Sequence, residues 1–221
     1  MKIGIIGSGI VGRVLATAFL KEGNEVMLGT RNTSKPEVVK WKGDNENGGT
    51  GTFADTAAFG DFLVLATSGP VTETAVQLAG IKNFNGKTVI DATNPIAAAP
   101  PVNGVIQYFT GPNESLMEKL QALVPEANFV KAFNSVGNSM MYEPNYNGIK
   151  PTMFICGNNG EAKKRLLIFW IVLAGKRQIL VKRNLQEPLN RWRCFGVSVG
   201  STIINGHMHS NYWNNNFLKT A

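Results

Sequence analysis

The stretch "KIGIIGSGIVGRVLATAFLKEG", residues 2–23, decides the fold. It begins with a short apolar run that is rich in isoleucine and ends in glycine, which is typical of a buried parallel strand. The residues that follow put four apolar side chains on one helical face: Val11, Leu15, Ala18 and Phe19. Gly23 is a stop signal after them. The stretch therefore predicts a strand that turns directly into a helix.

Three glycines at this junction have the G-x-G-x-x-G spacing of dinucleotide-binding loops: Gly7, Gly9 and Gly12. In such a loop the first glycine permits a tight turn, the second lets a pyrophosphate approach the backbone, and the third lets the helix pack close to the strand. The amides of residues 8–11, which include Ser8, Ile10 and Val11, would face the phosphates from a helix N-terminus. The alternative is a corner that uses glycine for geometry alone. The position between a strand and a helix favours nucleotide binding.

The end of the second predicted strand bears on which nucleotide is bound. NAD-binding domains carry an acidic residue there, about 20 residues after the glycine loop. This chain has "GTRN", residues 29–32, instead. Arg31 offers a planar fork of donors that suits a 2′-phosphate, and four polar residues lie beside it in the sequence: Thr30, Asn32, Ser34 and Lys35. We therefore predict NADP rather than NAD as the cofactor, and the alternative is a solvated loop arginine.

Strand and helix patterns alternate along the rest of the first 166 residues. Strands are predicted over 25–32, 61–69, 87–95, 128–135 and 151–159, and helices over 71–81 and 114–125. The segment Lys42–Thr52 is polar and glycine-rich, and it is predicted to be a loop. Alternation of this kind predicts an α/β fold with a doubly wound parallel sheet of the Rossmann type in a single domain.

The amino-acid composition excludes several classes of function. The chain has 221 residues, of which 43% are hydrophobic, and only two cysteines. It has no apolar run of the roughly 20 residues that a membrane helix needs, and no secretory signal pattern. We therefore expect a cytoplasmic protein with no membrane partner. The net charge of +7 is uneven. Residues 1–166 hold 15 basic and 14 acidic residues, and residues 167–221 hold seven and one. Residues 1–166 therefore lack the excess of basic residues that would predict a nucleic-acid partner.

Four motifs in order carry a family resemblance: "MKIGIIGSGIVG", "EVMLGTRN", "DATNP" and "KAFNSVG" with "MFICGNN". Through residues 1 to about 166 the chain resembles the NADP oxidoreductases that depend on the deazaflavin coenzyme F-420. The resemblance implies NADP(H) bound at the carboxyl ends of the strands. It also implies a homodimer and hydride transfer to or from a deazaflavin, flavin-like or other small-molecule acceptor.

The resemblance also assigns residues to parts of the site. Ser8, Ile10 and Val11 match the pyrophosphate loop, and Thr30 and Arg31 match the 2′-phosphate site. The wall near the ribose and nicotinamide is matched by Thr67 and Ser68, the turn beside the nicotinamide by Asn94 and Pro95, and the strand end on the substrate side by Ala132, Phe133 and Asn134. Two alternatives remain: Thr67 and Ser68 could only cap the next helix, and Asn94-Pro95 could be only a turn.

No acid–base pair, catalytic triad or metal cluster stands out in the sequence. The cofactor carries the chemistry of hydride transfer, so none is required. His207 and His209 have no carboxylate or thiol at matching spacing, and we expect no metal there. A non-catalytic NADP-sensing module is the alternative to an enzyme, and turnover of NADPH separates the two.

The segment 167–221 differs from the rest in charge and in its clustered tryptophans. We predict that it is read out of frame. Glu187–Val197, "EPLNRWRCFGV", can be back-translated so that a shifted reading gives "AIEPLAMLWC", which resembles the family. The same shift turns "NGHMHSNY" into "WTHAFKL". We accordingly expect this segment to be poorly packed, and the alternative is a genuine but divergent C-terminal element.

Overall fold

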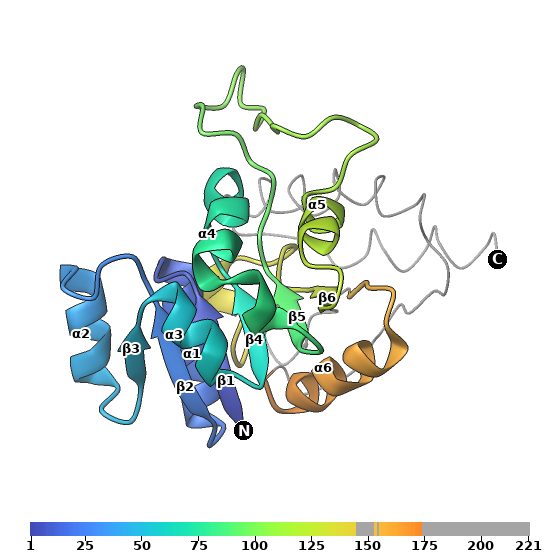
Figure 1. Cartoon of the computed structure of the whole chain (residues 1–221). Helices are drawn as coiled ribbons and strands as arrows, with labels where there is room; N and C mark the ends of the chain where they lie inside the picture. Colours follow the sequence, from blue (N-terminus) through green and yellow to red (C-terminus); the bar gives the residue numbers. More distant parts are fainter. Residues whose placement is uncertain (145–152, 154, 174–221) are drawn as a thin grey trace.

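The computed structural model describes residues 1–144, 153 and 155–173, and it describes the side chains of its last helix as far as Leu166. Six parallel strands form one sheet in the order β3-β2-β1-β4-β5-β6 (Figure 1). Their bounds are β1 (Lys2–Ile6), β2 (Glu25–Gly29), β3 (Gly49–Gly51), β4 (Phe62–Leu65), β5 (Thr88–Asp91) and β6 (Asn128–Lys131). The strand order reverses between β1 and β4, as in a doubly wound Rossmann sheet. The predicted fold class is confirmed.

Helices cover both faces of this sheet. They are α1 (Ile10–Lys21), α2 (Pro36–Asp44), α3 (Phe53–Phe59), α4 (Thr72–Ala79), α5 (Leu116–Leu123) and α6 (Gly160–Leu173). Three short 3-10 helices accompany them: η1 (Gly69–Val71), η2 (Ile81–Phe84) and η3 (Asn138–Met140). Because alternate residues of a strand point to opposite faces, the strands β1, β4, β5 and β6 contribute to two cores, and their core residues are apolar.

One core lies between the sheet and α1, α2 and α6, and it contains Ile5, Val64 and Ile90 together with Leu15 and Phe19 of α1. The other lies beneath α3, α4 and α5. Its strand residues include Leu65 and Val89, whereas its helical residues include Ala75, Val76 and Leu120. These side chains are almost completely buried. The carboxyl ends of all six strands therefore meet along one edge of a rigid sheet.

The predicted loop over residues 42–52 is only partly correct, because the segment contains the end of α2 and all of β3. Pro36 stands in the first turn of α2, where its missing N–H costs nothing. Thr52 and Asp55 form a reciprocal capping box at the start of α3. Both are local signals that the polar composition of the segment obscured.

The predicted strand over residues 151–159 was wrong for the described residues there, because Cys156 makes only an isolated antiparallel bridge with Lys131. Two backbone hydrogen bonds of 2.8 and 3.2 Å form the bridge. Helix α6 follows and continues past residue 166 to Leu173. Residues 174–221 lie outside the described part of the chain, and so does most of the segment that we predict to be out of frame.

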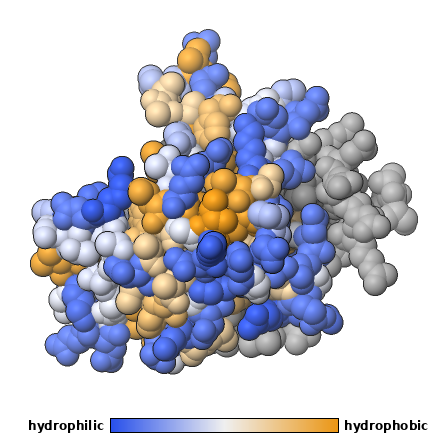
Figure 2. Space-filling model, viewed as in Figure 1, coloured by the Kyte–Doolittle hydropathy of each residue, from blue (hydrophilic) through white to orange (hydrophobic). Residues whose placement is uncertain are grey.

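Residues 96–109 form an arm that projects beyond α4 and α5 (Figure 1). Ile96 pairs with Tyr108, and Val102 with Val105, in antiparallel bridges. Figure 2 shows apolar side chains on this arm and around α4, where Val102, Val105 and Leu78 are each more than half exposed. Within the described ranges, no helix is long and apolar enough to cross a membrane.

Candidate nucleotide-binding site

The three glycines at the junction of β1 and α1 differ in their structural surroundings. Gly7 has a φ of 122°, and a Cβ there would lie 2.6 Å from the carbonyl oxygen of Ala66. A Cβ on Gly12 would overlap the carbonyl oxygen of Gly7. Neither position can hold a side chain, because the backbone conformation or the packing forbids it.

Gly9 is different. Its φ of −65° and ψ of 179° are open to any residue, and a Cβ there would meet no heavy atom of the described residues within 4 Å. Neither strain nor packing among these residues explains a glycine at this position. The open space lies at the N-cap of α1, whose first-turn amides have no intrahelical acceptor. The loop thus leaves room for an anion to approach the backbone at a helix N-terminus.

Two side chains hold the loop in this shape. Arg13, in the first turn of α1, donates a 2.7 Å hydrogen bond from Nη1 to the carbonyl oxygen of Ser8. Ser8 in turn donates a 3.0 Å hydrogen bond from Oγ to Oγ1 of Thr30, at the end of β2. The phosphate loop and the predicted 2′-phosphate loop are therefore joined directly. Arg13 was not predicted as a site residue, because nothing in the glycine motif specifies a residue at this position.

Thr30 is 2% exposed and its hydroxyl is engaged within the protein. Oγ1 accepts from Ser8 and from the amide of Asn32, and it donates to the carbonyl oxygen of Asn32. The side chain of Asn32 accepts a 2.9 Å hydrogen bond from the amide of Ser34. Thr30 and Asn32 thus shape the turn that carries Arg31.

Arg31, Asn32 and Ser34 are exposed, and Lys35 is partly exposed at the N-cap of α2. No acidic residue occurs between Thr30 and Lys35 in the sequence. Two cations therefore flank a turn at the carboxyl end of β2, and Glu37 in the first turn of α2 is the nearest acidic residue in sequence. The turn after β2 is therefore exposed and positively charged.

Thr67 and Ser68 follow β4, the strand next to β1. Oγ1 of Thr67 lies 2.8 Å from Oγ1 of Thr72, which donates to the carbonyl oxygen of Ser68. Ser68 is the N-cap residue of η1, but its side chain makes no capping hydrogen bond. Ser68 is exposed at the carboxyl edge of the sheet. Its placement leaves it accessible to a ligand at this edge.

The strand ends of β5 and β6 meet beside this turn. Nδ2 of Asn94 donates a 3.3 Å hydrogen bond to the carbonyl oxygen of Asn134, so the turn after β5 and the segment after β6 are in contact. Pro95 and Ala132 are buried. Phe133 is fully buried with a φ of 61°, which is uncommon for a bulky residue and bends the chain sharply after β6. Its amide contacts Sδ of Met153 at 3.3 Å.

Three polar residues lie beneath this contact. Asp91, at the end of β5, is completely buried, and its carboxylate accepts from the amide and hydroxyl of Thr93 at 2.9 and 2.6 Å. Nζ of Lys131, at the end of β6, lies 2.9 Å from Oδ2 of Asp91 and also donates to the carbonyl oxygen of Thr93. None of the three was predicted from the sequence, because "DATNP" was interpreted as a turn after one strand and "KAFN" as the end of another.

Two other groups near this edge have unusual surroundings. The hydroxyl of Ser135 is buried and has no hydrogen-bond partner among the described residues. Cys156 pairs with Lys131 through the backbone bridge, and burial raises the pKa of its thiol to about 11. The nearby ammonium of Lys131 opposes that shift, and the carboxylate of Asp91 adds to it. A thiol with so high a pKa is not a nucleophile at neutral pH.

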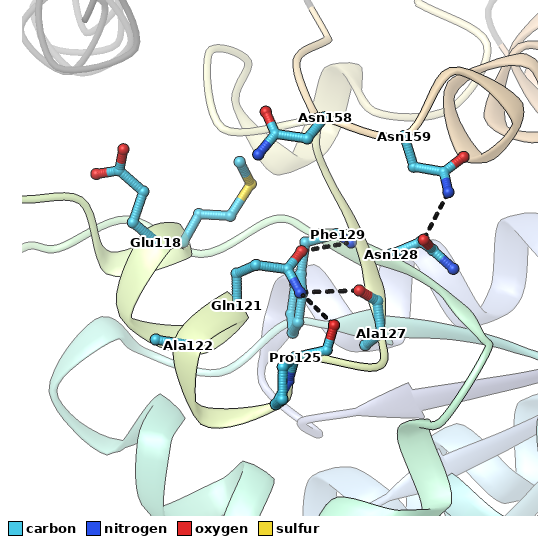
Figure 3. Close-up of a pocket in the computed structure, with 10 residues that line it drawn as sticks. Glu118, Gln121, Ala122, Pro125, Ala127, Asn128, Phe129, Asn158 and Asn159 are labelled. Atoms are coloured by element: carbon cyan, nitrogen blue, oxygen red, sulfur yellow. Dashed lines mark hydrogen bonds between the residues drawn. The ribbon is translucent and has the colours of Figure 1, made fainter. Parts of the chain in front are cut away.

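A surface hollow lies at the opposite edge of the sheet, where β6 begins (Figure 3). Gln121 of α5 donates from Nε2 to the carbonyl oxygens of Val124, Pro125 and Ala127. Asn159 bonds to Asn128 across the hollow at 2.7 Å. These polar groups satisfy one another, and the hollow is remote from the carboxyl ends of the strands. It is not the predicted site.

The structure brings the predicted residues together along one edge. Gly7 and Gly9 lie between β1 and α1, and Gly12 lies in the first turn of α1. The other predicted residues follow the ends of four strands: Thr30 and Arg31 after β2, Thr67 and Ser68 after β4, Asn94 and Pro95 after β5, and Ala132, Phe133 and Asn134 after β6. Ligands of doubly wound sheets bind outside the carboxyl ends of the strands, where the strand order reverses. In this chain that point lies between β1 and β4. Within the described ranges, no group of three or more metal-ligating side chains is present.

Comparison with known proteins agrees with this geometry. Residues 2–95 match the family described as NADP oxidoreductase, coenzyme F420-dependent. A structure from Arthrobacter sp., described as an F420-dependent NADP reductase, is 27% identical with a TM-score of 0.82, and the match covers 93% of this chain and 94% of that one. No curated protein matches the chain significantly.

More distant structures share the fold. A protein of Sinorhizobium meliloti is 21% identical with a TM-score of 0.68, over 81% of this chain and 84% of that one. A reductive aminase of Aspergillus terreus in complex with NADPH is 18% identical with a TM-score of 0.65, over 93% of this chain and 63% of that one. The family match over residues 2–95 and the similarity to the Arthrobacter structure support an oxidoreductase, and the chain resembles the NADP oxidoreductase, coenzyme F420-dependent, family over that range.

Proposed function

We propose that the chain binds NADP(H) at the carboxyl edge of its sheet and transfers a hydride between the nicotinamide and a deazaflavin, flavin-like or other small acceptor. The observation that carries the proposal is the open space at Gly9, which no contact among the described residues explains. Gly9 is the N-cap residue of α1, and the first-turn amides of a helix have no intrahelical acceptors, so this position favours a pyrophosphate.

The turn after β2 supports NADP over NAD. Arg31 and Lys35 supply positive charge there, and no carboxylate stands at the strand end to bind a ribose hydroxyl. Arg31 can form two parallel hydrogen bonds to a phosphate through its guanidinium fork. The bonds from Ser8 to Thr30 and within residues 30–34 hold that turn in place before a ligand arrives.

The nicotinamide supplies the hydride chemistry when it is bound, and the protein orients it. We assign that role to the edge formed by Thr67, Ser68, Asn94 and Asn134. Asn94 can accept a hydrogen bond through Oδ1 while its Nδ2 donates to Asn134. The buried hydroxyl of Ser135 is a further donor without a partner among the described residues. Hydride transfer needs no acid or base from this set.

An acceptor screen tests the reaction. NADPH oxidation is followed anaerobically with coenzyme F-420, FMN, FAD and riboflavin, after binding of NADPH has been measured on the same sample. We expect turnover with at least one of these acceptors. Tight NADPH binding without turnover of any acceptor would instead support a non-catalytic NADP-sensing module.

A further inference from the structure

The ion pair between Asp91 and Lys131 differs from the other ion pairs of the described residues. Lys40–Asp44, Lys119–Glu114 and Lys164–Glu161 lie on the surface, with each side chain at least 40% exposed. In the Asp91–Lys131 pair the side chains are 0% and 15% exposed. A buried pair of this kind is weak evidence for stability, because removing both charges from water offsets most of their attraction. A role other than stability is therefore worth seeking.

The position of the pair suggests that role. Asp91 and Lys131 are direct register partners in the parallel pairing of β5 with β6, and each is the last residue of its strand. Three residues beyond each lie Asn94 and Asn134, which contact one another. The pair thus sits at the base of the two segments that face the proposed nicotinamide position.

The contacts of the pair reach into those two segments. Nζ of Lys131 binds both the carboxylate of Asp91 and the carbonyl oxygen of Thr93. Asp91 also holds the amide and hydroxyl of Thr93, and its carbonyl oxygen accepts from the amide of Ala132 at 3.1 Å. A single ammonium from β6 therefore fixes the backbone of the turn after β5. Phe133, with its positive φ, then directs Asn134 back toward that turn.

We propose that Lys131 is a positioning residue: its ion pair with Asp91 locks the turn at residues 93–95 against the segment 132–134, so that Asn94 and Asn134 orient the nicotinamide. The inference rests on the proposed function. It assigns to Lys131 no contact with the ligand and no part in the chemistry.

Two ligands separate this role from a purely structural one. NADP⁺ contains the nicotinamide half, whereas 2′-phospho-ADP-ribose retains the adenosine and phosphate parts without nicotinamide. The affinity ratio of the two ligands, measured by calorimetry, reports how well the nicotinamide is held. This measurement needs no hydride acceptor. We expect NADP⁺ to bind the unmodified protein at least about fivefold more tightly, which is the contribution of one hydrogen bond.

Three variants complete the design, and thermal unfolding is measured for each. Lys131→Met removes the ammonium. The double variant, Asp91→Asn with Lys131→Met, removes both charges and keeps a side-chain oxygen that accepts from Thr93. Lys131→Arg keeps the charge. In the two variants with methionine we expect the ratio to fall toward one with unchanged binding of 2′-phospho-ADP-ribose, and in Lys131→Arg we expect it to be largely retained. Lys119→Met, which breaks a surface pair, is the matched control and should leave the ratio unchanged.

Every other outcome overturns the inference. A double variant that is folded and keeps the full ratio shows that the pair has only a structural role. A double variant that cannot fold shows that the pair is needed for stability. A ratio near one in the unmodified protein means that the nicotinamide is not oriented at all. If the unmodified protein binds neither ligand, the proposed function fails as well, and that result is distinct from the others.

Discussion

Replacing Gly9 with valine should abolish NADPH binding and leave the fold intact. The added side chain meets no heavy atom of the protein within 4 Å, and the extended backbone at this residue accepts a β-branched side chain. The structural cost is the weaker helix cap, about 0.5–1 kcal/mol. For a chain of this size that cost lowers the Tm by only roughly 1–4 °C.

The binding cost is much larger. Valine fills the space through which a pyrophosphate reaches the amides of the α1 N-terminus. Losing two hydrogen bonds to a charged group costs about 3–6 kcal/mol, which is roughly 10²–10⁴-fold in Kd. NADPH fluorescence titration measures that loss, and circular dichroism on heating measures the Tm.

Two further glycines supply the controls. Gly43 in α2 also has open space at its Cβ position, so Gly43→Val adds the same side chain elsewhere and should leave NADPH binding unchanged. Gly12→Ala should lower stability instead, by about 1–3 kcal/mol or more, because its Cβ overlaps the carbonyl oxygen of Gly7. A Gly9→Val protein with an unchanged Tm and unchanged NADPH affinity would show that the loop is only a corner between strand and helix.

Two more predictions concern Arg31 and Cys156. Arg31→Ala should weaken NADPH binding about 5- to 30-fold, because it removes an exposed charge-assisted contact of about 1–2 kcal/mol. NADH binding should be unchanged. Equal losses for both cofactors in parallel titrations would contradict the 2′-phosphate assignment. Cys156 should resist iodoacetamide at pH 8 in the folded protein and react quickly in urea, because burial raises its pKa from 9.0 to about 11. The folded state keeps the thiol proton of Cys156 up to a higher pH than the unfolded state does. The contribution of this proton to folding stability is therefore present below pH 9 and is lost as the pH rises toward 11. Mass spectrometry of the Cys156 peptide and unfolding curves across this pH range test both statements, and equal labelling rates in the folded and unfolded protein would refute the burial argument.

The centre of the fold was predictable from local patterns. β1, the glycine loop and α1 follow from an apolar run, three spaced glycines and one helical face, and all three are present where expected. The strands β2, β4, β5 and β6 were also predicted, because each contains a short apolar run of the kind that buried parallel strands have. The secondary structure from Pro36 to Phe59 was harder to predict. β3 has only three residues, two of them glycine, and exists because it pairs with β2.

The positions of the candidate site residues at the strand ends were predictable from the sequence, but the contacts between them were not. The glycine loop and Arg31 are local motifs, so their proposed roles rest on the sequence alone. The ion pair of Asp91 with Lys131 joins residues 40 positions apart, and only the register of β5 with β6 brings them together. The bond from Ser8 to Thr30 likewise depends on the pairing of β1 with β2. Contacts set by register leave no spacing pattern in a single sequence.

The central claim is that the carboxyl edge of this sheet binds NADP(H) and selects it over NAD(H). Calorimetric titration of the unmodified, folded protein with NADPH and with NADH tests the claim most directly. The phosphate loop and the cationic turn at Arg31 predict that both cofactors bind and that NADPH binds at least about tenfold more tightly, a difference of about 1.4 kcal/mol. Equal affinities for the two cofactors, or no binding of either, would contradict the account.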